Sequence, residues 1–512
     1  MFKLYDIRTK RQNLSDADVD RLLGAVARYY KESVQVESVF LGRDARIYCA
    51  EMMDRALEIF PQYGLDVYFN PLPMGTCQFY YSCMVHRASG GVMLTASHNP
   101  KDYIGLKLVG RDVRPIAMDC GPAGGLRQVK RNYEEGAGSG KAVRKGQIHI
   151  AQYQKEFVAY SMKLAGVAPG DLKGLKIYGE FLSGTGGMDF ALAMDLAGAD
   201  MTLSHIIPNG LFLQGDPNPI EEETISPVRE IVRQGDYDIG FCFDGDGDRM
   251  DLMYPDGSQV IPGLNMAMLV PYIQKIYEPY FGEGTVLKAY VDVKAVPPAL
   301  AEIAKAGLEQ HIIRNGHSFI KEKLREHFAE GFAVSEEESA HYYMYFPYDP
   351  DDFSKGFAPV ENTLFFSLLT AKALKEDPDG YKKAYELQKG IYRCREWPMM
   401  FLPGHDAEME AVMHEVENLM RAGGAAVIQK MDDGTNLDAT LMRFHLPEHI
   451  TAETVFPQRW CQVAQRISRS EDGITRWEVV ASDEKLCREV NEMIRSITDV
   501  YVQKGIARYG LG

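Results

Sequence analysis

The segment GGVMLTASHNPKDYIGLKL, residues 90–108, begins like a buried strand and then ends abruptly in the sequence Ser-His-Asn-Pro at residues 97–100. A serine on a sharp turn after a strand is exposed where its side chain can act. Serine and asparagine also cap ordinary turns, so a structural role is the alternative interpretation. The flanking glycines of the G-x-S-x-G nucleophile elbow of hydrolases are absent. The segment therefore predicts a strand that ends in a reactive loop of a different kind.

Short β-type runs alternate with longer helical patterns on both sides of this segment. The β-α-β alternation predicts parallel sheets covered by helices. The sequence Asp-Pro-Asp-Gly at residues 377–380 is a cluster of helix-breaking residues after the third group of alternating elements. The expected strands cover residues 39–41, 66–69, 91–95, 175–178, 239–243 and 284–290, and the expected helices cover residues 45–60, 150–164, 297–305, 318–327, 361–374 and 483–497.

A chain of 512 residues is too long for one hydrophobic core, so three or four domains are expected. A stretch rich in glycine and charge at residues 134–146 reads as a linker or surface hairpin, and the character of the sequence changes near residue 395. The last part contains Trp460 and Trp477 and is expected to be a smaller α+β domain, while the first three units are compatible with one shared architecture. The expected domains cover residues 1–149, 150–258, 259–375 and 395–512.

The bulk composition limits the classes of partner. A net charge of −16 and a pI near 5.3 argue against nucleic acid and anionic membranes, which favour a basic protein face, but permit a small anionic substrate. The sequence has no apolar run that approaches a membrane span and no apolar core of a signal peptide, so a cytoplasmic location is expected. The eight cysteines form no C-x-x-C pair and are expected to be free, buried thiols.

The sequence FDGDGDR, residues 243–249, places three carboxylates at alternate positions directly after an apolar run. The intervening glycines let the backbone fold tightly so that Asp244, Asp246 and Asp248 converge. Converging carboxylates repel one another unless a cation lies between them, and hard oxygen ligands suit Mg²⁺. An ordinary acidic turn is the alternative, whereas an EF-hand is excluded because its required glycine and glutamate positions hold arginine and proline. The pattern therefore predicts a magnesium site.

A serine hydroxyl near such a metal can carry a phosphoryl group, because the metal neutralises charge during phosphoryl transfer. The TASHNP segment and the FDGDGDR segment, in this order, resemble the α-D-phosphohexomutase superfamily, whose members include phosphoglucomutases and phosphomannomutases. The resemblance extends over nearly the whole chain. The further similar segments are FKLYDIR at residues 2–8, GRDAR at 42–46, NPLP at 70–73, DPNP at 216–219, SEEESAHYY at 335–343 and RISRSE at 466–471.

Two of these segments suggest specific chemistry. Residues 335–343 resemble the family's sugar-recognition loop, G-E-x-S-G-H, and offer a carboxylate and a hydroxyl that can hydrogen-bond vicinal sugar hydroxyls. Residues 466–471 resemble its phosphate-binding loop, R-x-S-x-T-E, and offer one arginine and two hydroxyls for a phosphate dianion. Without the resemblance, a solvated acidic helix start and a surface loop would be the ordinary interpretations.

The resemblance implies four domains around a central cleft, of which three are mixed α/β domains of shared architecture and the C-terminal one is an α+β domain. It implies an intramolecular phosphotransferase that moves phosphate between O1 and O6 of a hexose. In that reaction a phosphoserine donates its phosphoryl group to the bound monophosphate. The resulting hexose 1,6-bisphosphate turns around in the cleft and returns its other phosphate to the serine. Mg²⁺ and hexose 1,6-bisphosphate are the implied cofactors.

The resemblance also assigns roles to individual residues. Ser97 would carry the phosphoryl group, and Arg8 and Lys107 would handle the hydroxyl proton or stabilise the transferring charge. A surface salt bridge is the alternative role for each of these two cations. The expected metal ligands are Asp244, Asp246, Asp248 and Ser97. The expected catalytic residues are Ser97, Arg8, Lys107, His317 and His341. The expected substrate-binding residues are Tyr5, Arg249, Lys294, Glu337, Ser339, Arg466, Ser468 and Ser470.

Departures from the family pattern concentrate in the sugar-recognition loop. Ala340 stands where the family has glycine, and the additional carboxylate of Glu338 is a candidate for adjusting the choice of sugar. The loop favours mannose and/or glucose phosphates, with phosphoglucosamine mutase or phosphopentomutase as alternatives in the same superfamily. A non-catalytic sugar-phosphate binding protein and a Mg²⁺-dependent phosphatase are alternatives of other classes. The expected partner is a small-molecule phosphosugar, bound by a monomer or homodimer, with no nucleic acid and no membrane.

Overall fold

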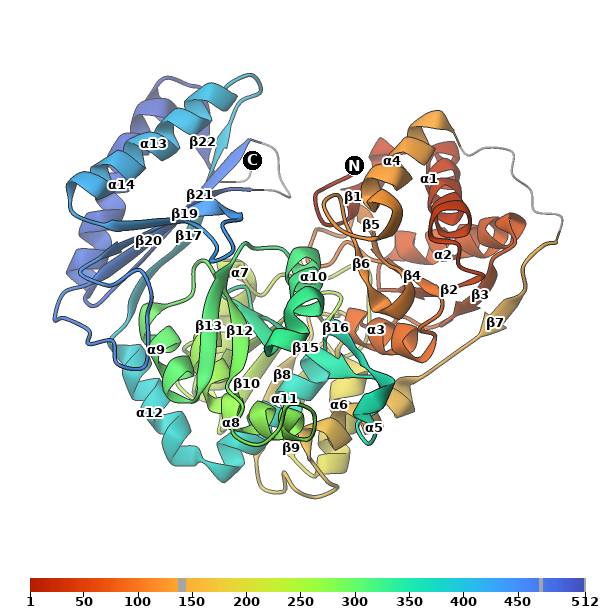
Figure 1. The fold of residues 1–512 in the computed structure, drawn as a ribbon, viewed down its shortest axis with the longest axis horizontal. Helices are drawn as coiled ribbons and strands as arrows, with labels where there is room; N and C mark the ends of the chain where they lie inside the picture. Colours follow the sequence, from red (N-terminus) through yellow and green to blue (C-terminus); the bar gives the residue numbers. More distant parts are fainter. Residues whose placement is uncertain (137–143, 469–472, 511–512) are drawn as a thin grey trace.

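Three of the four sheets repeat one strand order. The computed structural model describes residues 1–136, 144–468 and 473–510, and Figure 1 shows its arrangement. In each of these three sheets, three parallel strands lie in the order second, first, third, and a fourth strand runs antiparallel beside the third. The mixed α/β class is therefore confirmed. The expected parallel pairing holds for three strands of each of these sheets, whereas the fourth strand is antiparallel. In spatial order the three sets are β3 (Asp66–Phe69), β2 (Ser38–Arg43), β4 (Gly90–Leu94) and β5 (Tyr103–Val109); β9 (Asp200–Ser204), β8 (Lys176–Glu180), β10 (Ile239–Phe243) and β11 (Met250–Met253); and β13 (Leu308–Ile313), β12 (Leu287–Asp292), β14 (Phe332–Glu337) and β15 (His341–Pro347).

Additional strands extend the first and third sheets. The N-terminal strand β1 (Ile7–Lys10) pairs antiparallel with β5, so that Arg8 lies opposite Gly105. This pairing places the N-terminal segment beside the strand that follows the Ser-His-Asn-Pro loop. The other added strands are β6 (Pro115–Ile116) and β7 (Ile148–Ile150) in the first sheet and β16 (Phe357–Glu361) in the third.

Amphipathic helices cover the faces of these sheets (Figure 1). In α1, Val19, Leu22, Leu23 and Val26 are buried at the spacing of one helix face, and Ser15 begins the helix with a capping box. Burial of such stripes joins each helix to its sheet. The helices of the first three sheets are α1 (Asp16–Arg28), α2 (Ile47–Ile59), α3 (Thr76–Val85), α4 (Leu126–Glu135), α5 (Gln154–Ala165), α6 (Gly187–Ala197), α7 (Glu222–Gln234), α8 (Pro262–Phe281), α9 (Pro297–Lys305), α10 (His317–His327) and α11 (Thr363–Glu376).

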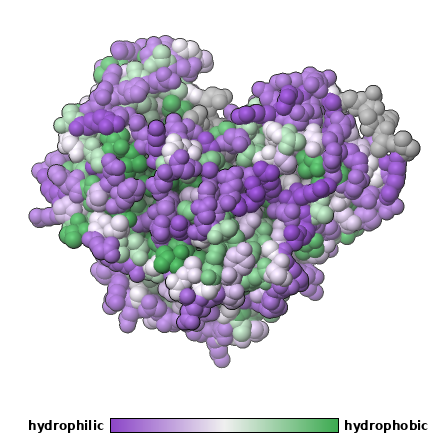
Figure 2. Space-filling view, in the orientation of Figure 1, coloured by the Kyte–Doolittle hydropathy of each residue, from purple (hydrophilic) through white to green (hydrophobic). Residues whose placement is uncertain are grey.

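The last sheet is antiparallel throughout and has a hydrophobic core of its own around Trp477 and Val479. Two long helices cover one of its faces, and Figure 1 shows this part across from the first sheet, with a notch between them in the space-filling view (Figure 2). The strands, in spatial order, are β18 (Ala426–Lys430), β19 (Asn436–Phe444), β20 (Cys461–Ile467), β21 (Ile474–Ala481), β17 (Tyr392–Phe401) and β22 (Ala507–Tyr509), and the helices are α13 (Asp406–Ala422) and α14 (Glu484–Gln503). The exact domain boundaries stay a prediction.

The structure shifts several expected element boundaries. The helix expected from residue 150 begins at Gln154, because residues 148–150 pair with β3 as strand β7. The helix expected from residue 361 begins at Thr363, where the Asn362 side chain caps it. Residues 377–380 do end α11, but they also begin α12 (Pro378–Lys389), since the Asp377 side chain accepts a hydrogen bond from the Gly380 amide.

All eight cysteines are free; six are buried and two are half-buried. Among the residues that the structure describes, no helix is both long enough and apolar enough to cross a membrane.

Candidate active site

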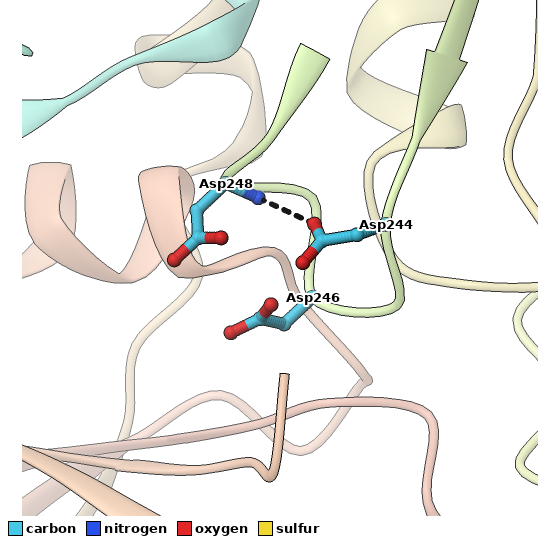
Figure 3. Close-up of side chains that lie close together, drawn as sticks. All are labelled: Asp244, Asp246 and Asp248. Atoms are coloured by element: carbon cyan, nitrogen blue, oxygen red, sulfur yellow. Dashed lines mark hydrogen bonds between the residues drawn. The ribbon is translucent and has the colours of Figure 1, made fainter. Parts of the chain in front are cut away.

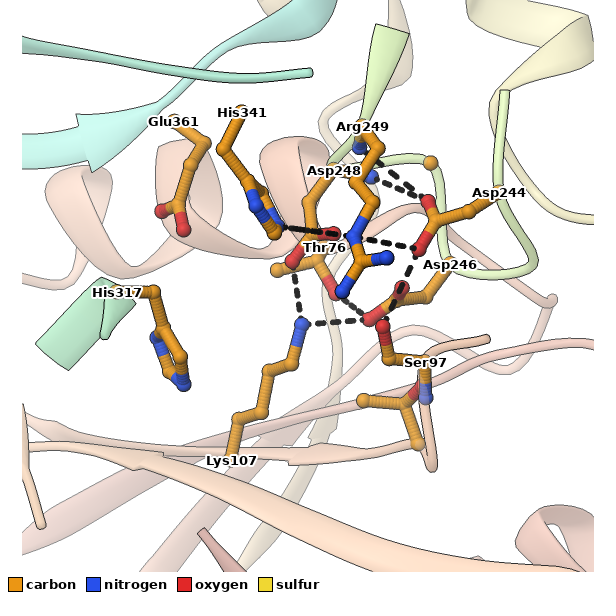
Figure 4. Close-up of polar contacts among 12 residues, drawn as sticks. Thr76, Ser97, Lys107, Asp244, Asp246, Asp248, Arg249, His317, His341 and Glu361 are labelled. Carbon is orange, nitrogen blue, oxygen red and sulfur yellow. Dashed lines mark hydrogen bonds and ion pairs between the residues drawn. The ribbon is translucent and has the colours of Figure 1, made fainter. Parts of the chain in front are cut away.

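Three loops at equivalent positions of the three sheets meet at the site. Each connects the end of a parallel strand to its antiparallel neighbour: β4 to β5, β10 to β11, and β14 to β15. The Oγ of Ser97 in the first loop donates a hydrogen bond of 3.2 Å to Asp244 in the second. The amide of Met250 donates to the carbonyl of Ala340 in the third loop at 3.0 Å. The repeated strand order therefore brings the three sequence motifs together (Figure 4).

The backbone of the serine loop is strained at Ser97. Ser97 is 2% exposed and has a backbone φ of 52°, in the left-handed region that non-glycine residues rarely adopt. Its amide donates to the Thr95 hydroxyl at 2.8 Å, and Nδ1 of His98 lies 3.2 Å from its Oγ. The backbone conformation turns Ser97 toward the acidic loop.

Arg46 anchors this loop from beneath and was not among the expected site residues. It is completely buried beside Asp44, with its Nε 3.0 Å from the carboxylate. Its guanidinium donates to the backbone carbonyls of Ser97, Asn99 and Pro100, the first at 2.7 Å. Asp44 also accepts a hydrogen bond from Thr95 at 2.8 Å. One buried ion pair therefore holds both sides of the serine loop.

Replacing Arg46 by lysine is expected to lower turnover by about tenfold or more, because an ammonium cannot donate to three carbonyls in the fork geometry of a guanidinium. Lysine keeps a positive charge beside Asp44 and so avoids leaving a buried carboxylate unpaired. Steady-state turnover of the purified variant measures the effect. Arg43→Lys is the control, because Arg43 lies in the same turn and bonds to the carbonyls of Asp44 and Pro71 instead. Equal turnover in the two variants would contradict the anchoring role.

The acidic loop gathers three buried carboxylates. Ligand oxygens of Asp244, Asp246 and Asp248 all lie within 4.8 Å of one another, and Figure 3 shows the three side chains side by side. Oδ1 of Asp244 accepts hydrogen bonds from the amides of Asp248 and Arg249 at 3.1 and 3.2 Å. A side chain on Gly245 would bring its Cβ within 2.8 Å of the Ser97 carbonyl, so glycine is required for the two loops to approach.

The charges of this loop favour a cation. Burial and the neighbouring carboxylates of Asp248 and Asp246 raise the pKa of Asp244 to about 7. The ammonium of Lys107 pairs with Asp248 and lies 2.8 Å from Asp246. Oδ1 of Asp246 is buried and has no hydrogen-bond partner among the residues that the structure describes. An unpartnered buried carboxylate oxygen within a set of hard ligands fits Mg²⁺.

The sugar-recognition loop joins the acidic loop through His341. Its Nε2 lies 3.3 Å from Asp248, and its Nδ1 lies 3.4 Å from Glu337 and 3.1 Å from the Ser339 hydroxyl. Burial opposes protonation of His341, but Asp248 and Glu337 raise its pKa to about 9. Ala340 has a φ of 65°, which explains why glycine would suit this position.

The N-terminal segment contacts the serine loop and the connection between β13 and α10. Arg8 donates to the side chain of Asn99 at 2.9 Å and pairs with Asp6 at 2.7 Å. The hydroxyl of Tyr5 donates to the carbonyl of Asn315 at 2.6 Å, and its ring packs edge-on against His317 at 5.9 Å between centroids. Burial, with the nearby lysines, lowers the pKa of His317 well below its usual value, so its imidazole is neutral. A direct substrate contact by Tyr5 stays a prediction.

A second group of cations surrounds Glu396, which was not among the expected site residues. Arg466 forms two hydrogen bonds with its carboxylate, at 2.7 and 2.8 Å, and Arg476 and Lys294 lie 3.5 and 3.8 Å away. Ser468 is buried after β20, and its amide donates to Ile474 at 2.7 Å. Ser470 lies outside the described residues. The structure thus brings Arg466 and Lys294 together as expected for an anion site, with a carboxylate between them.

A repeated α/β scaffold presents a strained serine to a buried acidic triad, an arrangement that suits phosphoryl transfer. Family models described as phosphoglucomutase/phosphomannomutase alpha/beta/alpha domain I and domain II match residues 1–120 and 152–257. A phosphomannomutase of Salmonella typhimurium is 29% identical over 351 residues, which are 67% of this chain and 72% of that protein. A phosphoglucomutase of Neisseria meningitidis is 26% identical over 349 residues, 67% of this chain and 70% of its own length.

The fold also matches a solved structure along almost its full length. A phosphoglucomutase/phosphomannomutase family protein of Burkholderia thailandensis superposes with a TM-score of 0.70 at 18% identity, covering 99% of this chain and 98% of the other. The chain is therefore similar to the phosphoglucomutase/phosphomannomutase family in its first two α/β units and in its overall fold. The relatives named phosphomannomutase and phosphoglucomutase are intramolecular phosphotransferases.

Proposed function

We propose that the protein interconverts hexose 1-phosphate and hexose 6-phosphate, with mannose and/or glucose as the sugar, through a phosphoserine on Ser97 and a hexose 1,6-bisphosphate. The observation that carries this proposal is the 3.2 Å contact between the Ser97 Oγ and Asp244, within a triad that can hold a metal ion. Such a contact places a phosphorylated serine next to the metal-binding carboxylates.

The metal would be Mg²⁺, held by Asp244, Asp246, Asp248 and a phosphoserine oxygen, and its chemistry is the neutralisation of phosphate charge. In the transfer step a sugar hydroxyl oxygen attacks the phosphorus, the bond to Ser97 Oγ breaks, and the hydroxyl proton leaves the sugar. Lys107 is held protonated because Asp246 and Asp248 raise its pKa against the effect of burial, so it stabilises charge rather than accepting the proton. Neutral His317, whose buried Nε2 has no hydrogen-bond partner among the described residues, is our candidate acceptor.

The phosphate that does not react would bind at the second group of cations. Arg466, Lys294 and Ser468 supply donors for a dianion, and the bound sugar would reach from there to Glu337 and Ser339. Because the bisphosphate must turn around between the two transfers, this site has to accept either end of the sugar.

Replacing Arg466 by alanine is expected to raise the KM for every phosphosugar by about tenfold or more, because a bidentate, charge-assisted contact is lost. The preference between glucose and mannose phosphates is expected to stay the same, since a phosphate ligand does not read the sugar. Steady-state kinetics with both substrates measure the two effects. The control is Arg421→Ala, because Arg421 is a partly exposed arginine that pairs with Glu417 one turn earlier on the same helix, α13. A changed sugar preference with an unchanged KM would contradict the assignment.

The proposed function is tested by ³¹P NMR of the protein with Mg²⁺ and a trace of hexose bisphosphate. Separate samples contain glucose 1-phosphate, mannose 1-phosphate, glucosamine 1-phosphate and ribose 1-phosphate. We expect a 6-phosphate signal from glucose or mannose. Conversion of only the amino sugar or the pentose would keep the mechanism but overturn the choice of sugar. Release of inorganic phosphate would identify a phosphatase, and no change in any sample would favour a binding protein. A cytoplasmic location and a monomeric or homodimeric state stay predictions.

A further inference from the structure

The carboxylate of Glu338 pairs with an arginine of the C-terminal sheet. Glu338 lies in the sugar-recognition loop between Glu337 and Ser339, yet its side chain is completely buried. One carboxylate oxygen lies 2.8 Å from Nη1 of Arg393, which belongs to β17 of the C-terminal sheet. The other oxygen has no hydrogen-bond partner among the described residues. An effect of Glu338 on the choice of sugar stays a prediction.

Arg393 joins the loop to a second carboxylate in the C-terminal sheet. Its Nε and Nη2 both lie 2.7 Å from Glu478 on β21, whose side chain is 3% exposed. Two residues before Glu478 on the same strand is Arg476, which belongs to the cation group around Glu396. Because side chains two apart on a strand lie on the same face, Arg393 and the expected phosphate site share one face of β21.

Asp292 supports the same loop from the other side. Its two carboxylate oxygens accept hydrogen bonds from the amides of Glu338 and Lys294, each at 2.9 Å. Lys294 in turn lies 3.8 Å from Glu396, beside Arg466. The backbone of the sugar-recognition loop and the backbone that carries Lys294 are therefore held by one buried carboxylate. Two routes, one through Arg393 and one through Asp292, connect the sugar loop to the phosphate-binding group.

We propose that Arg393 is a positioning residue that ties the sugar-recognition loop, through Glu338, to the sheet that carries the phosphate site. The tether sets the distance between the group that reads the sugar and the group that holds its phosphate. Loss of the tether is expected to lower the affinity for a ligand that contacts both groups. It is expected to leave unchanged the affinity for a ligand that contacts only the cations around Glu396. This inference rests on the proposed function, because it takes the two groups as parts of one phosphosugar site.

The test compares a bridging ligand with a non-bridging one. Glu338→Gln keeps the shape of the side chain and removes its charge, and the added amide replaces the oxygen that has no partner. Arg393→Lys keeps a charge but cannot bridge two carboxylates as the guanidinium does. Both variants and their combination are made in a Ser97→Ala background, so that the ligand is not consumed. Calorimetry at pH 8 measures the Kd of glucose 1-phosphate and, separately, of inorganic phosphate.

Each single variant is expected to raise the Kd of glucose 1-phosphate by about tenfold, because one charge-assisted contact is lost. The Kd of inorganic phosphate is expected to change by less than about twofold. The double variant is expected to bind glucose 1-phosphate no more weakly than the more affected single variant, because both substitutions remove the same contact between Glu338 and Arg393. Glu322→Gln is the control, since Glu322 is a buried glutamate that forms a partly exposed ion pair of 2.7 Å with Arg114 between other elements. This control is expected to bind both ligands normally.

If the increases in the Kd of glucose 1-phosphate multiply in the double variant, the proposal is overturned, because Glu338 and Arg393 would then act on the ligand separately. Normal binding of glucose 1-phosphate by Glu338→Gln would overturn it as well. Equal weakening of both ligands in the singles would show a general loss of structure rather than a tether. These results are independent of turnover, so a failed tether and a failed mutase assignment, which the ³¹P experiment with unmodified protein measures, are distinguishable.

Discussion

Replacing Ser97 by alanine is expected to lower turnover by about a thousandfold or more while the phosphosugar still binds. The Ser97 Oγ is the atom that the structure turns toward the acidic triad, at 3.2 Å from Asp244. Without it the phosphoryl group has no carrier, whereas the sugar-recognition loop and the cation group remain. Turnover is followed by ³¹P NMR, and binding of glucose 1-phosphate is followed by calorimetry.

Ser89→Ala is the matched control for this experiment. Ser89 is also buried, precedes the other end of β4, and bonds to the hydroxyl of Ser38. Its loss is expected to leave turnover unchanged, apart from a small effect on stability. Sustained turnover of Ser97→Ala in the presence of hexose bisphosphate would contradict the phosphoserine mechanism. Loss of both turnover and binding would show that the serine is needed to hold the loop itself.

The parts of the fold that the sequence predicted well are those with strong local signals. Strand β10 and helix α9 have the expected bounds, residues 239–243 and 297–305, because one is a continuous apolar run and the other begins at a proline. The antiparallel strands β5, β11 and β15 were not predicted, because the direction of each depends on the loop that connects it to the strand before it. Those loops are the functional segments, whose residues are chosen for chemistry rather than for turn formation.

The candidate site was predictable where its residues are neighbours in the sequence. The three aspartates converge as their alternating spacing indicates, and the order of the motifs anticipates the meeting of the loops. Glu396, which pairs with Arg466 across 70 positions, gave no such signal. A partner of this kind is determined by the pairing of distant strands, β17 with β21 and β21 with β20. Single-sequence spacing contains no information on that register.

Buried charges explain the other misses. Arg46 and Arg393 each appear in the sequence as ordinary polar residues, and polar residues are most often exposed. The structure buries Arg46 and half-buries Arg393 because each has carboxylate partners, Asp44 for one and Glu338 with Glu478 for the other. Motif resemblance identified the segment around Arg46 and the loop that contains Glu338. It could not say that Arg46 would hold the serine loop or that Glu338 would pair with Arg393.

Replacing Asp246 by asparagine is expected to weaken metal binding by about a hundredfold, with a matching loss of turnover at ordinary Mg²⁺ concentrations. Oδ1 of Asp246 is the buried oxygen without a partner among the described residues, and Oδ2 accepts hydrogen bonds from Thr76 at 2.6 Å and Lys107 at 2.8 Å. Asparagine keeps the shape of the side chain but removes the charge that the cation needs. Mn²⁺ serves as the probe, because electron paramagnetic resonance reports the free ion directly.

Asp251→Asn is the control for the metal experiment, since Asp251 is a buried aspartate on the adjoining strand β11 and bonds to Gln259 rather than to the triad. It is expected to bind Mn²⁺ like the unmodified protein. Chelation by EDTA is expected to abolish turnover of the unmodified protein, and added Mg²⁺ is expected to restore it. Normal Mn²⁺ affinity in Asp246→Asn would exclude Asp246 as a metal ligand. No measurable Mn²⁺ binding by the unmodified protein would mean that Lys107, already paired with Asp246 and Asp248, neutralises the triad in place of a metal. The acidic loop would then position the serine loop through hydrogen bonds and charge alone.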